Sequence, residues 1–176
     1  MIKGSLKRTA CCRGFTLLEL LVVVALIGTI SLSVMPVFIS AMNGIQLRNA
    51  RNDLIAAIRF AQEMAVRESV EYRIYFNTEE HSYRIMRLSG LNEKDEKQFE
   101  IAETLLGEKQ VLPQYLEIER IKARKAPSSQ EKYIACLPNG SSDVSEILLR
   151  DTRVRGNHFK ISVEGPLGQV EIKDLR

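Results

Sequence analysis

One long uncharged segment limits what this chain can fold into more than any other feature. Residues 20–42 contain no charged side chain, and this run exceeds the roughly 20 apolar residues that an α-helix needs to cross the hydrocarbon core of a membrane. A carboxylate, Glu19, stands directly before the run. We therefore expect a single membrane-spanning helix, and the remainder of the 176 residues suffices for one packed domain.

Residues 1–14 form a basic leader that sets the orientation of this helix. The leader contains no acidic residue and four basic ones, Lys3, Lys7, Arg8 and Arg13. By the positive-inside rule the N-terminus lies in the cytoplasm, and the chain after the span lies outside it. Removing the leader takes away four of the 25 basic residues and changes the formal charge from +3 to −1. The net charge of the remaining chain therefore does not favour nucleic acid as a partner.

The order of leader and apolar run differs from that of a secretory signal peptide, in which the apolar run precedes the cleavage site. Here a cut at Gly14 would leave the run on the mature protein. A lipoprotein signal at Cys11 or Cys12 is excluded because no apolar run of sufficient length precedes these two cysteines. A processed chain would keep only Cys136, which cannot form an internal disulfide, and its apolar neighbours predict a small buried side chain.

Gly14 is followed by Phe15-Thr16-Leu17-Leu18-Glu19 and then by the apolar run. This order resembles the class III leader of type IV pilins and type II secretion pseudopilins. The resemblance implies that a prepilin peptidase cuts between Gly14 and Phe15 and that the new N-terminal Phe15 is N-methylated. Glu19 then becomes the fifth residue of the mature chain.

Glu19 needs a reason to stand at the edge of a membrane segment, because an ionised carboxylate inside a bilayer is costly. Cleavage would create a cationic amino group at Phe15, either four residues away in the same helix or in an adjacent subunit. Buried ion pairs are best supported as devices that fix register, and the family resemblance implies the same assembly role for Glu19. The alternative is that Glu19 reaches the cytoplasmic interface close to Arg13.

Gly28 and Pro36 weaken the helix within the apolar run, because both residues are poor helix formers. We expect a helix kink at these positions. The pilin resemblance implies a segment that can lose helical order in a filament, and a bend that only steers the helix toward the next domain is equally compatible.

The rest of the chain changes from a helical to a strand pattern near residue 70. Apolar residues at helical spacing predict an amphipathic helix over residues 43–69. Alternation predicts strands at 70–76, 83–88, 115–124, 132–137, 146–150, 158–163 and 169–173. A change of apolar phase between Ile118 and Ile121 indicates either a bulge or the end of that strand. Residues 77–82 and 164–168 are predicted turns, and residues 126–130 a loop. Residues 92–109 are predicted to be an exposed insertion with one short helix carrying Phe99, Ala102 and Leu105 and ending at Gly107.

The second half of the chain also resembles one branch of the pilin family. The segments that carry this likeness are residues 60–67 leading into 70–74, residues 137–141 before 147–151, and residues 168–172. They are similar to type II secretion system protein H (GspH) and the related FimT-like minor pilins. Residues 89–130 match no part of that family that we can place.

We expect no catalytic, cofactor-binding or metal-binding residues. His81 and His158 have no partner at the spacing of a metal site or triad, and Ser141 and Ser142 belong to turn chemistry. Two basic groups are predicted to be solvated strand faces: Arg120, Lys122, Arg124 and Lys125, and Arg150, Arg153, Arg155 and Lys160. In a protein that takes up DNA, the second group would be the first candidate for phosphate contacts.

These observations predict an α+β fold with a long N-terminal membrane-spanning helix packed on an antiparallel β-rich, pilin-like head. The expected parts are a leader (1–14), a transmembrane assembly half of the helix (15–42), an amphipathic periplasmic half (43–69) and the head (70–176).

The resemblance implies a non-enzymatic minor pseudopilin of a bacterial type II secretion system, a structural subunit of the periplasmic pseudopilus that helps to export folded proteins. Its expected partners are the prepilin peptidase, other major and minor pseudopilins, the inner membrane, and secreted substrates or the secretion channel. One alternative is a FimT-like minor pilin that primes type IV pilus assembly or DNA uptake. The other is a signal-anchored periplasmic domain outside any filament.

Overall fold

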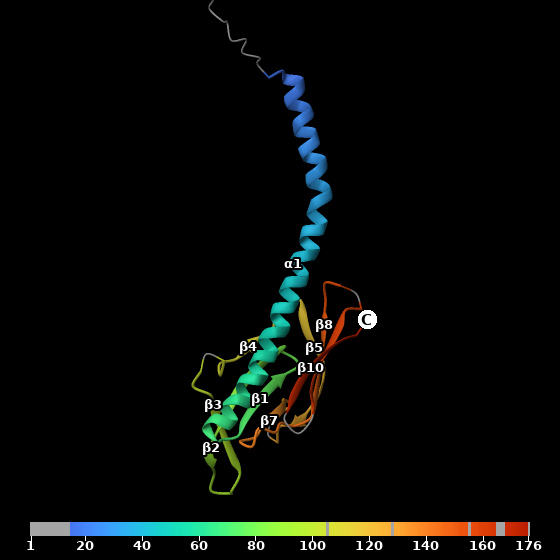
Figure 1. The fold of residues 1–176 in the computed structure, drawn as a ribbon. Helices are drawn as coiled ribbons and strands as arrows, with labels where there is room; N and C mark the ends of the chain where they lie inside the picture. Colours follow the sequence, from blue (N-terminus) through green and yellow to red (C-terminus); the bar gives the residue numbers. More distant parts are fainter. Residues whose placement is uncertain (1–14, 105, 128, 155, 165–167, 176) are drawn as a thin grey trace, which may run out of the picture. The chain divides into compact units, whose positions relative to one another are not determined.

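The computed structural model describes residues 15–104, 106–127, 129–154, 156–164 and 168–175. Within these residues a long helix is followed by strands (Figure 1). The chain divides into two compact units, one ending at Gly44 and the other beginning at Ile45. The elements are α1 (Leu17–Glu68), β1 (Tyr72–Asn77), β2 (Ser82–Leu91), β3 (Lys97–Ile101), β4 (Gln110–Val111), β5 (Leu116–Lys122), β6 (Arg124–Lys125), β7 (Lys132–Cys136), β8 (Ser145–Asp151), β9 (His158–Glu164) and β10 (Gln169–Leu175).

The first unit contains the part of α1 up to Gly44, whose apolar side chains are exposed. Its length and composition suffice to cross a membrane. Hydroxyl groups in this part bond to the helix backbone: Thr29 Oγ1 donates to Ala25 O at 2.9 Å, and Ser33 Oγ donates to Thr29 O at 3.2 Å. These polar groups are therefore satisfied within the helix, as an apolar environment requires.

α1 continues without interruption past Gly28 and Pro36. Proline removes one backbone donor, and its ring crowds the carbonyl of the preceding turn, so this is the weakest part of the helix. An unbroken helix is compatible with a bend, and the kink expected at these two residues stays a prediction.

The second unit begins with the amphipathic part of α1, which confirms the helix predicted over residues 43–69. The helix buries one face against the sheets, and the close approach depends on small residues because Ala57, Ala61 and Ala65 are fully buried. Ser69 has a positive φ of 56°, and Val70 N donates to Ala65 O at 3.2 Å, which ends the helix. The buried helix residues are Ala50, Leu54, Ile55, Ala57, Ile58, Ala61 and Ala65.

The first antiparallel sheet has the strand order β3-β2-β1-β7-β6, and β4 also pairs with β2. β1 lies between β2 and β7, with Ile74 opposite both Ile85 and Ile134. These three isoleucines are fully buried and belong to one cluster with the buried helix residues. The strand predicted over residues 70–76 is confirmed from Tyr72 onward, and one face of this sheet packs against the core. Tyr75, predicted to be on the exposed face, is buried in a second cluster.

The second antiparallel sheet has the order β10-β9-β8-β5. Its inward side chains, among them Ile147 and Phe159, join the same core. The register of β5 against β8 shifts between Ile118 and Arg120 while the strand continues, so of the two predicted alternatives the structure has the bulge. The fold is thus α+β, with a long N-terminal helix followed by antiparallel β-sheets, as predicted.

The short helix predicted within residues 92–109 is wrong. Residues 97–101 form β3, in which Phe99 lies opposite Leu88 of β2. The helix was predicted from the spacing of Phe99 and Ala102. Ala102 is buried, but it follows the end of β3, where its N–H donates to Ile85 O at 3.2 Å. The residue at 105 lies outside the described residues, and Gly107 follows a turn closed by its N–H to Thr104 O. Strand pairing with β2 outweighed a weak local preference for helix.

The connection between β9 and β10 is held by a glutamine of the helix. β9 and β10 pair as the predicted hairpin, and residues 165–167 lie outside the described residues. Gln62 Nε2 donates to Gly168 O at 2.7 Å and to Ser142 Oγ at 3.0 Å. Gly168 has a φ of +60°, so it combines a left-handed backbone with close packing.

Replacing Gly168 with alanine is expected to lower the free energy of unfolding by about 2–4 kcal/mol, because left-handed strain adds to the loss of hydrogen bonds. The new Cβ would lie 2.6 Å from Gln62 Nε2 and 2.7 Å from Ser142 Oγ. Gly156→Ala is the matched control, because Gly156 has a φ of +81° with no atom within 4 Å of an added Cβ. The control should lose only about 1–2 kcal/mol in denaturant unfolding. Equal losses in both variants would contradict the role of Gln62.

Candidate assembly segment and head surfaces

Thr16 caps the N-terminus of α1. Glu19 N donates to Thr16 Oγ1 at 3.2 Å, and Leu20 N donates to Thr16 O at 3.2 Å. The helix begins at Leu17, so Glu19 is its third residue, which is the acidic position of a capping box. The positive end of the helix dipole favours a carboxylate there. The sequence reasoning gave Thr16 no role, although the Thr-x-x-Glu spacing carries this signal.

The exposed N-terminal segment brings together the residues expected to act in processing and assembly. Phe15 is 70% exposed and Glu19 is exposed, next to a continuous run of exposed apolar side chains. Gly14 lies outside the described residues. Cleavage after Gly14, methylation of Phe15 and the assembly role of Glu19 therefore stay predictions.

Cys136 is fully buried on β7, which confirms the small buried side chain predicted for this position. Burial raises the pKa of its thiol to about 12. The thiolate is the nucleophilic form of cysteine, so this side chain is inert at neutral pH.

The two histidines contact the head in different ways. His81 has a positive φ of 47° in the turn before β2, and its Nδ1 accepts a hydrogen bond from Ile118 N at 3.1 Å. His158 Nδ1 lies 3.0 Å from Glu119 Oε2 of β5, across the intervening strand β8. Across the described ranges, no group of three or more His, Cys, Asp or Glu side chains is placed to hold a metal ion.

The basic groups on the strands are largely paired with carboxylates. Lys122 and Lys160 both contact Glu146, at 2.7 and 3.0 Å, and their hydrogen bonds lower the pKa of Glu146 to about 2. Arg150 lies 2.5 Å from Glu117. Residue 155 is outside the described residues. Basic and acidic side chains are thus paired across the strand surface, which supports a solvated face rather than a phosphate-binding one.

Arg153 ties a loop to the helix. Its guanidinium carbon lies 3.6 Å from the centre of the Tyr115 ring, and the side chain donates to both oxygens of Asp151 at 3.0 Å. It also donates to Gln46 Oε1 at 2.9 Å. Asp151 is only 3% exposed, so this arrangement is a structural anchor.

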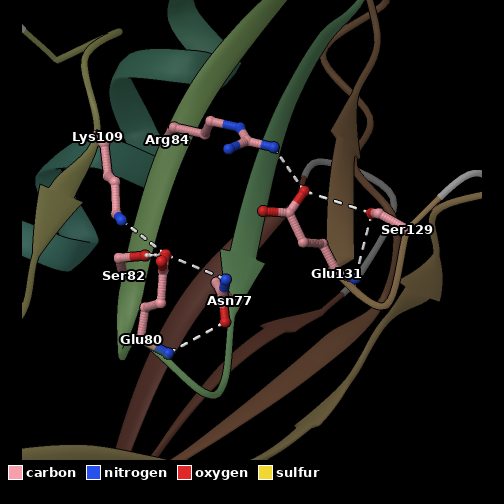
Figure 2. A network of polar contacts seen from close by, with 7 residues as sticks. All are labelled: Asn77, Glu80, Ser82, Arg84, Lys109, Ser129 and Glu131. Carbon is pink, nitrogen blue, oxygen red and sulfur yellow. Dashed lines mark hydrogen bonds and ion pairs between the residues drawn. The ribbon is translucent and has the colours of Figure 1, made fainter.

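A polar network fixes two loops beside the first sheet (Figure 2). Asn77 Oδ1 accepts hydrogen bonds from Glu79 N and Glu80 N at 2.9 and 3.1 Å, which closes the predicted turn. Glu80 pairs with Lys109 at 2.6 Å, as Figure 2 shows. On the other loop, Glu131 accepts hydrogen bonds from Arg84 at 2.6 Å and from Ser129 at 3.4 Å. These contacts connect the turn before β2 to Lys109, and the loop before β7 to Arg84 of β2.

Arg73 forms the centre of an aromatic cluster on the face of the first sheet that points away from α1. Its guanidinium carbon lies 3.9 Å from the centre of the Phe99 ring and 4.4 Å from that of Tyr133. Glu71 is buried beside it, and receives hydrogen bonds from Arg73 Nε at 2.8 Å and from Lys97 Nζ. This cluster was missed, because its members come from three strands that are distant in the sequence.

Glu71 is expected to make the stability of the head sensitive to acid. Burial opposes its ionisation, but the hydrogen bonds from Lys97 and Arg73 outweigh burial and lower the pKa below its ordinary value of 4.5. A lowered folded-state pKa stabilises the fold above about pH 4.5, and this contribution disappears as the pH falls through the folded-state value. Glu71→Gln should therefore flatten the pH dependence of the melting temperature below pH 4.5. Parallel profiles for the two proteins would show that Glu71 has no such role.

The comparisons with known proteins agree with this arrangement. Residues 9–35 match a family model described as the prokaryotic N-terminal methylation motif. A structure of the minor pseudopilin EpsH from the type 2 secretion system of Vibrio cholerae superposes with a TM-score of 0.52 at 9% identity, over 72% of this chain and 94% of that chain. A crystal structure of the same protein gives 0.49 at 10% identity, over 73% and 92%. No curated protein sequence matches. The motif and the fold confirm the predicted resemblance to pilin-like proteins.

Proposed function

We propose that this chain is a minor pseudopilin of a bacterial type II secretion system, a structural subunit of the periplasmic pseudopilus that helps to export folded proteins. The observation that carries the proposal is a combination: the N-terminal methylation motif over residues 9–35 precedes an exposed apolar helix, and the chain has the fold of a minor pseudopilin. A pilin-like head alone or a membrane anchor alone would be compatible with many other tasks.

The proposed path begins in the inner membrane, with the N-terminus in the cytoplasm and the head in the periplasm. The prepilin peptidase cuts between Gly14 and Phe15, and Phe15 is methylated. The Glu19 carboxylate pairs with the N-terminal amine of an adjacent subunit and fixes the axial register as the helix leaves the membrane. The apolar side chains of α1, exposed in the single chain, are then covered by other pseudopilins.

In this proposal the protein works without enzymatic activity. The buried Cys136 and the paired charges of the strands serve the fold. Its partners are the peptidase, other pseudopilins, and secreted substrates or the secretion channel.

Deletion of the gene in the native bacterium tests the type of system. Loss of folded enzymes from the culture medium, restored by the wild-type gene, is the expected result. A FimT-like role in a type IV pilus would instead leave secretion intact and abolish piliation or DNA uptake. That second outcome would overturn the assignment to secretion while keeping the protein in the pilin pathway.

A further inference from the structure

β3 is the open edge of the first sheet. Within the described part of the chain it is the terminal strand, paired with β2 alone. It has five residues, Lys97–Ile101, without proline or glycine. The opposite edge of the same sheet is β6, which has two basic residues and lies close to Pro127. β3 also carries two charged side chains, Lys97 and Glu100, but it is longer than β6 and offers more free backbone groups to a further strand.

The backbone of β3 presents hydrogen-bonding groups toward this open side. Ala102 N donates to Ile85 O of β2, so residue 102 faces β2. Backbone groups alternate in direction along an antiparallel strand, so those of Phe99 and Ile101 point away from β2. Ile101 is 57% exposed, which leaves its backbone approachable. An added strand could therefore form main-chain hydrogen bonds at two positions.

An acidic pocket of about 560 Å³ lies beside the end of β3. Its lining includes three carboxylates, from Glu68, Glu100 and Glu103, and one guanidinium, from Arg87. Arg87 is shared between Glu68 at 2.8 Å and Glu100 at 3.2 Å. The pocket therefore has three carboxylates but only one guanidinium among its lining residues, so its charge is complementary to a basic group.

Thr104 also belongs to the lining, but its hydroxyl oxygen is buried away from the surface of the pocket, so the carboxylates are the groups that an incoming side chain would meet. Lysine and arginine side chains combine a positive charge with several hydrogen-bond donors, which matches these carboxylates.

We propose that β3 accepts an extended segment of a partner protein as an added β-strand, with a lysine or arginine of that segment in the acidic pocket. Side chains of an added strand alternate between the two faces of the sheet. One set would lie beside Phe99 and Ile101, which favours β-branched or aliphatic residues there. The other set would lie on the side of Glu100 and the pocket. Strand addition uses only the second unit of the chain, which includes Glu68 at the end of α1, so it is separable from filament assembly through the exposed apolar part of α1.

The test is a random heptapeptide library displayed on phage and selected on the full chain in detergent. Enriched peptides are expected to carry a lysine or arginine flanked by β-branched residues. The affinity of one synthetic peptide from this set is then measured by fluorescence anisotropy against the wild type and three variants. Absence of any enriched peptide, or enrichment without basic residues, would overturn the proposal.

Two variants at one position separate backbone pairing from side-chain contact. Ile101→Pro removes the outward N–H without removing a ladder hydrogen bond, and proline is tolerated at such edge positions. It should weaken peptide binding at least tenfold, whereas Ile101→Ala keeps the N–H and should stay within about threefold. A peptide that binds Ile101→Pro as tightly as the wild type would contradict strand addition.

Glu103→Lys tests the pocket and remains informative if Ile101→Pro fails to fold, because Glu103 is exposed. Binding of the basic peptide should fall about fivefold or more, and the loss should shrink at high salt. Replacing the basic residue of the peptide with glutamine should make wild type and Glu103→Lys bind alike. If the basic peptide binds Glu103→Lys as tightly as it binds the wild type, the pocket does not bind the basic side chain of the added strand.

Discussion

Replacing Glu19 with alanine is expected to reduce incorporation of the protein into filaments by more than a hundredfold while processing continues. In the proposed assembly the change would leave the N-terminal amine of the adjacent subunit unpaired in an apolar environment, and removal of one partner of a buried ion pair costs about 3–5 kcal/mol. The measurement is immunoblotting of sheared filaments from cells that overproduce the pseudopilus, compared with the membrane fraction.

Thr16→Val is the matched control for Glu19→Ala. It removes the cap that accepts the Glu19 N–H at 3.2 Å but keeps the carboxylate. Loss of a helix cap costs about 1 kcal/mol, so incorporation should fall less than tenfold. Wild-type incorporation of Glu19→Ala would contradict a role in assembly, and equal losses in both variants would assign Glu19 to capping alone.

Replacing Phe159 with alanine is expected to be the most destabilising of the head substitutions considered. Phe159 is 1% exposed, and its ring also contacts the guanidinium of Arg51 at 5.0 Å from the centroid. Arg51 in turn pairs with Asp174 of β10 at 2.9 Å. A buried Phe→Ala change costs about 3–5 kcal/mol, a large part of the total stability of a domain. Thermal unfolding of the full chain in detergent measures the effect.

Phe159→Leu separates volume from aromatic contact. Leucine keeps most of the apolar volume but loses the cation–π contact with Arg51, so it should cost about half as much or less. If Phe159→Ala unfolds at the wild-type temperature, the core in which β9 and α1 meet does not contribute to stability as described.

The elements that could be predicted are those with a strong local pattern. Residues 43–69 repeat small and apolar residues at helical spacing, and residues 72–76 alternate because only one side of β1 faces the shared core. The bulge near Ile118 was visible because the apolar phase changes there. In these segments local preference and tertiary packing agree.

β3 and the Arg73 cluster could not be predicted, because long-range contacts determine them. β3 is held by pairing with β2, and its charged residues hide the alternation around Phe99. Arg73 lies between rings from β3 and β7, a contact that no spacing in the sequence indicates. Thr16 differs from both, since its capping position could be predicted from the spacing to Glu19 alone.

Measuring the mass of the N-terminal peptide shows whether the protein is processed as a pilin-like subunit. The protein would be extracted from membranes of cells with and without the prepilin peptidase and analysed by intact-mass and peptide mass spectrometry. We expect a chain that begins with N-methylated Phe15, found only when the peptidase is present. An unprocessed chain that begins at Met1 in both strains would contradict assembly into any pilin-like filament and would leave a membrane-anchored domain.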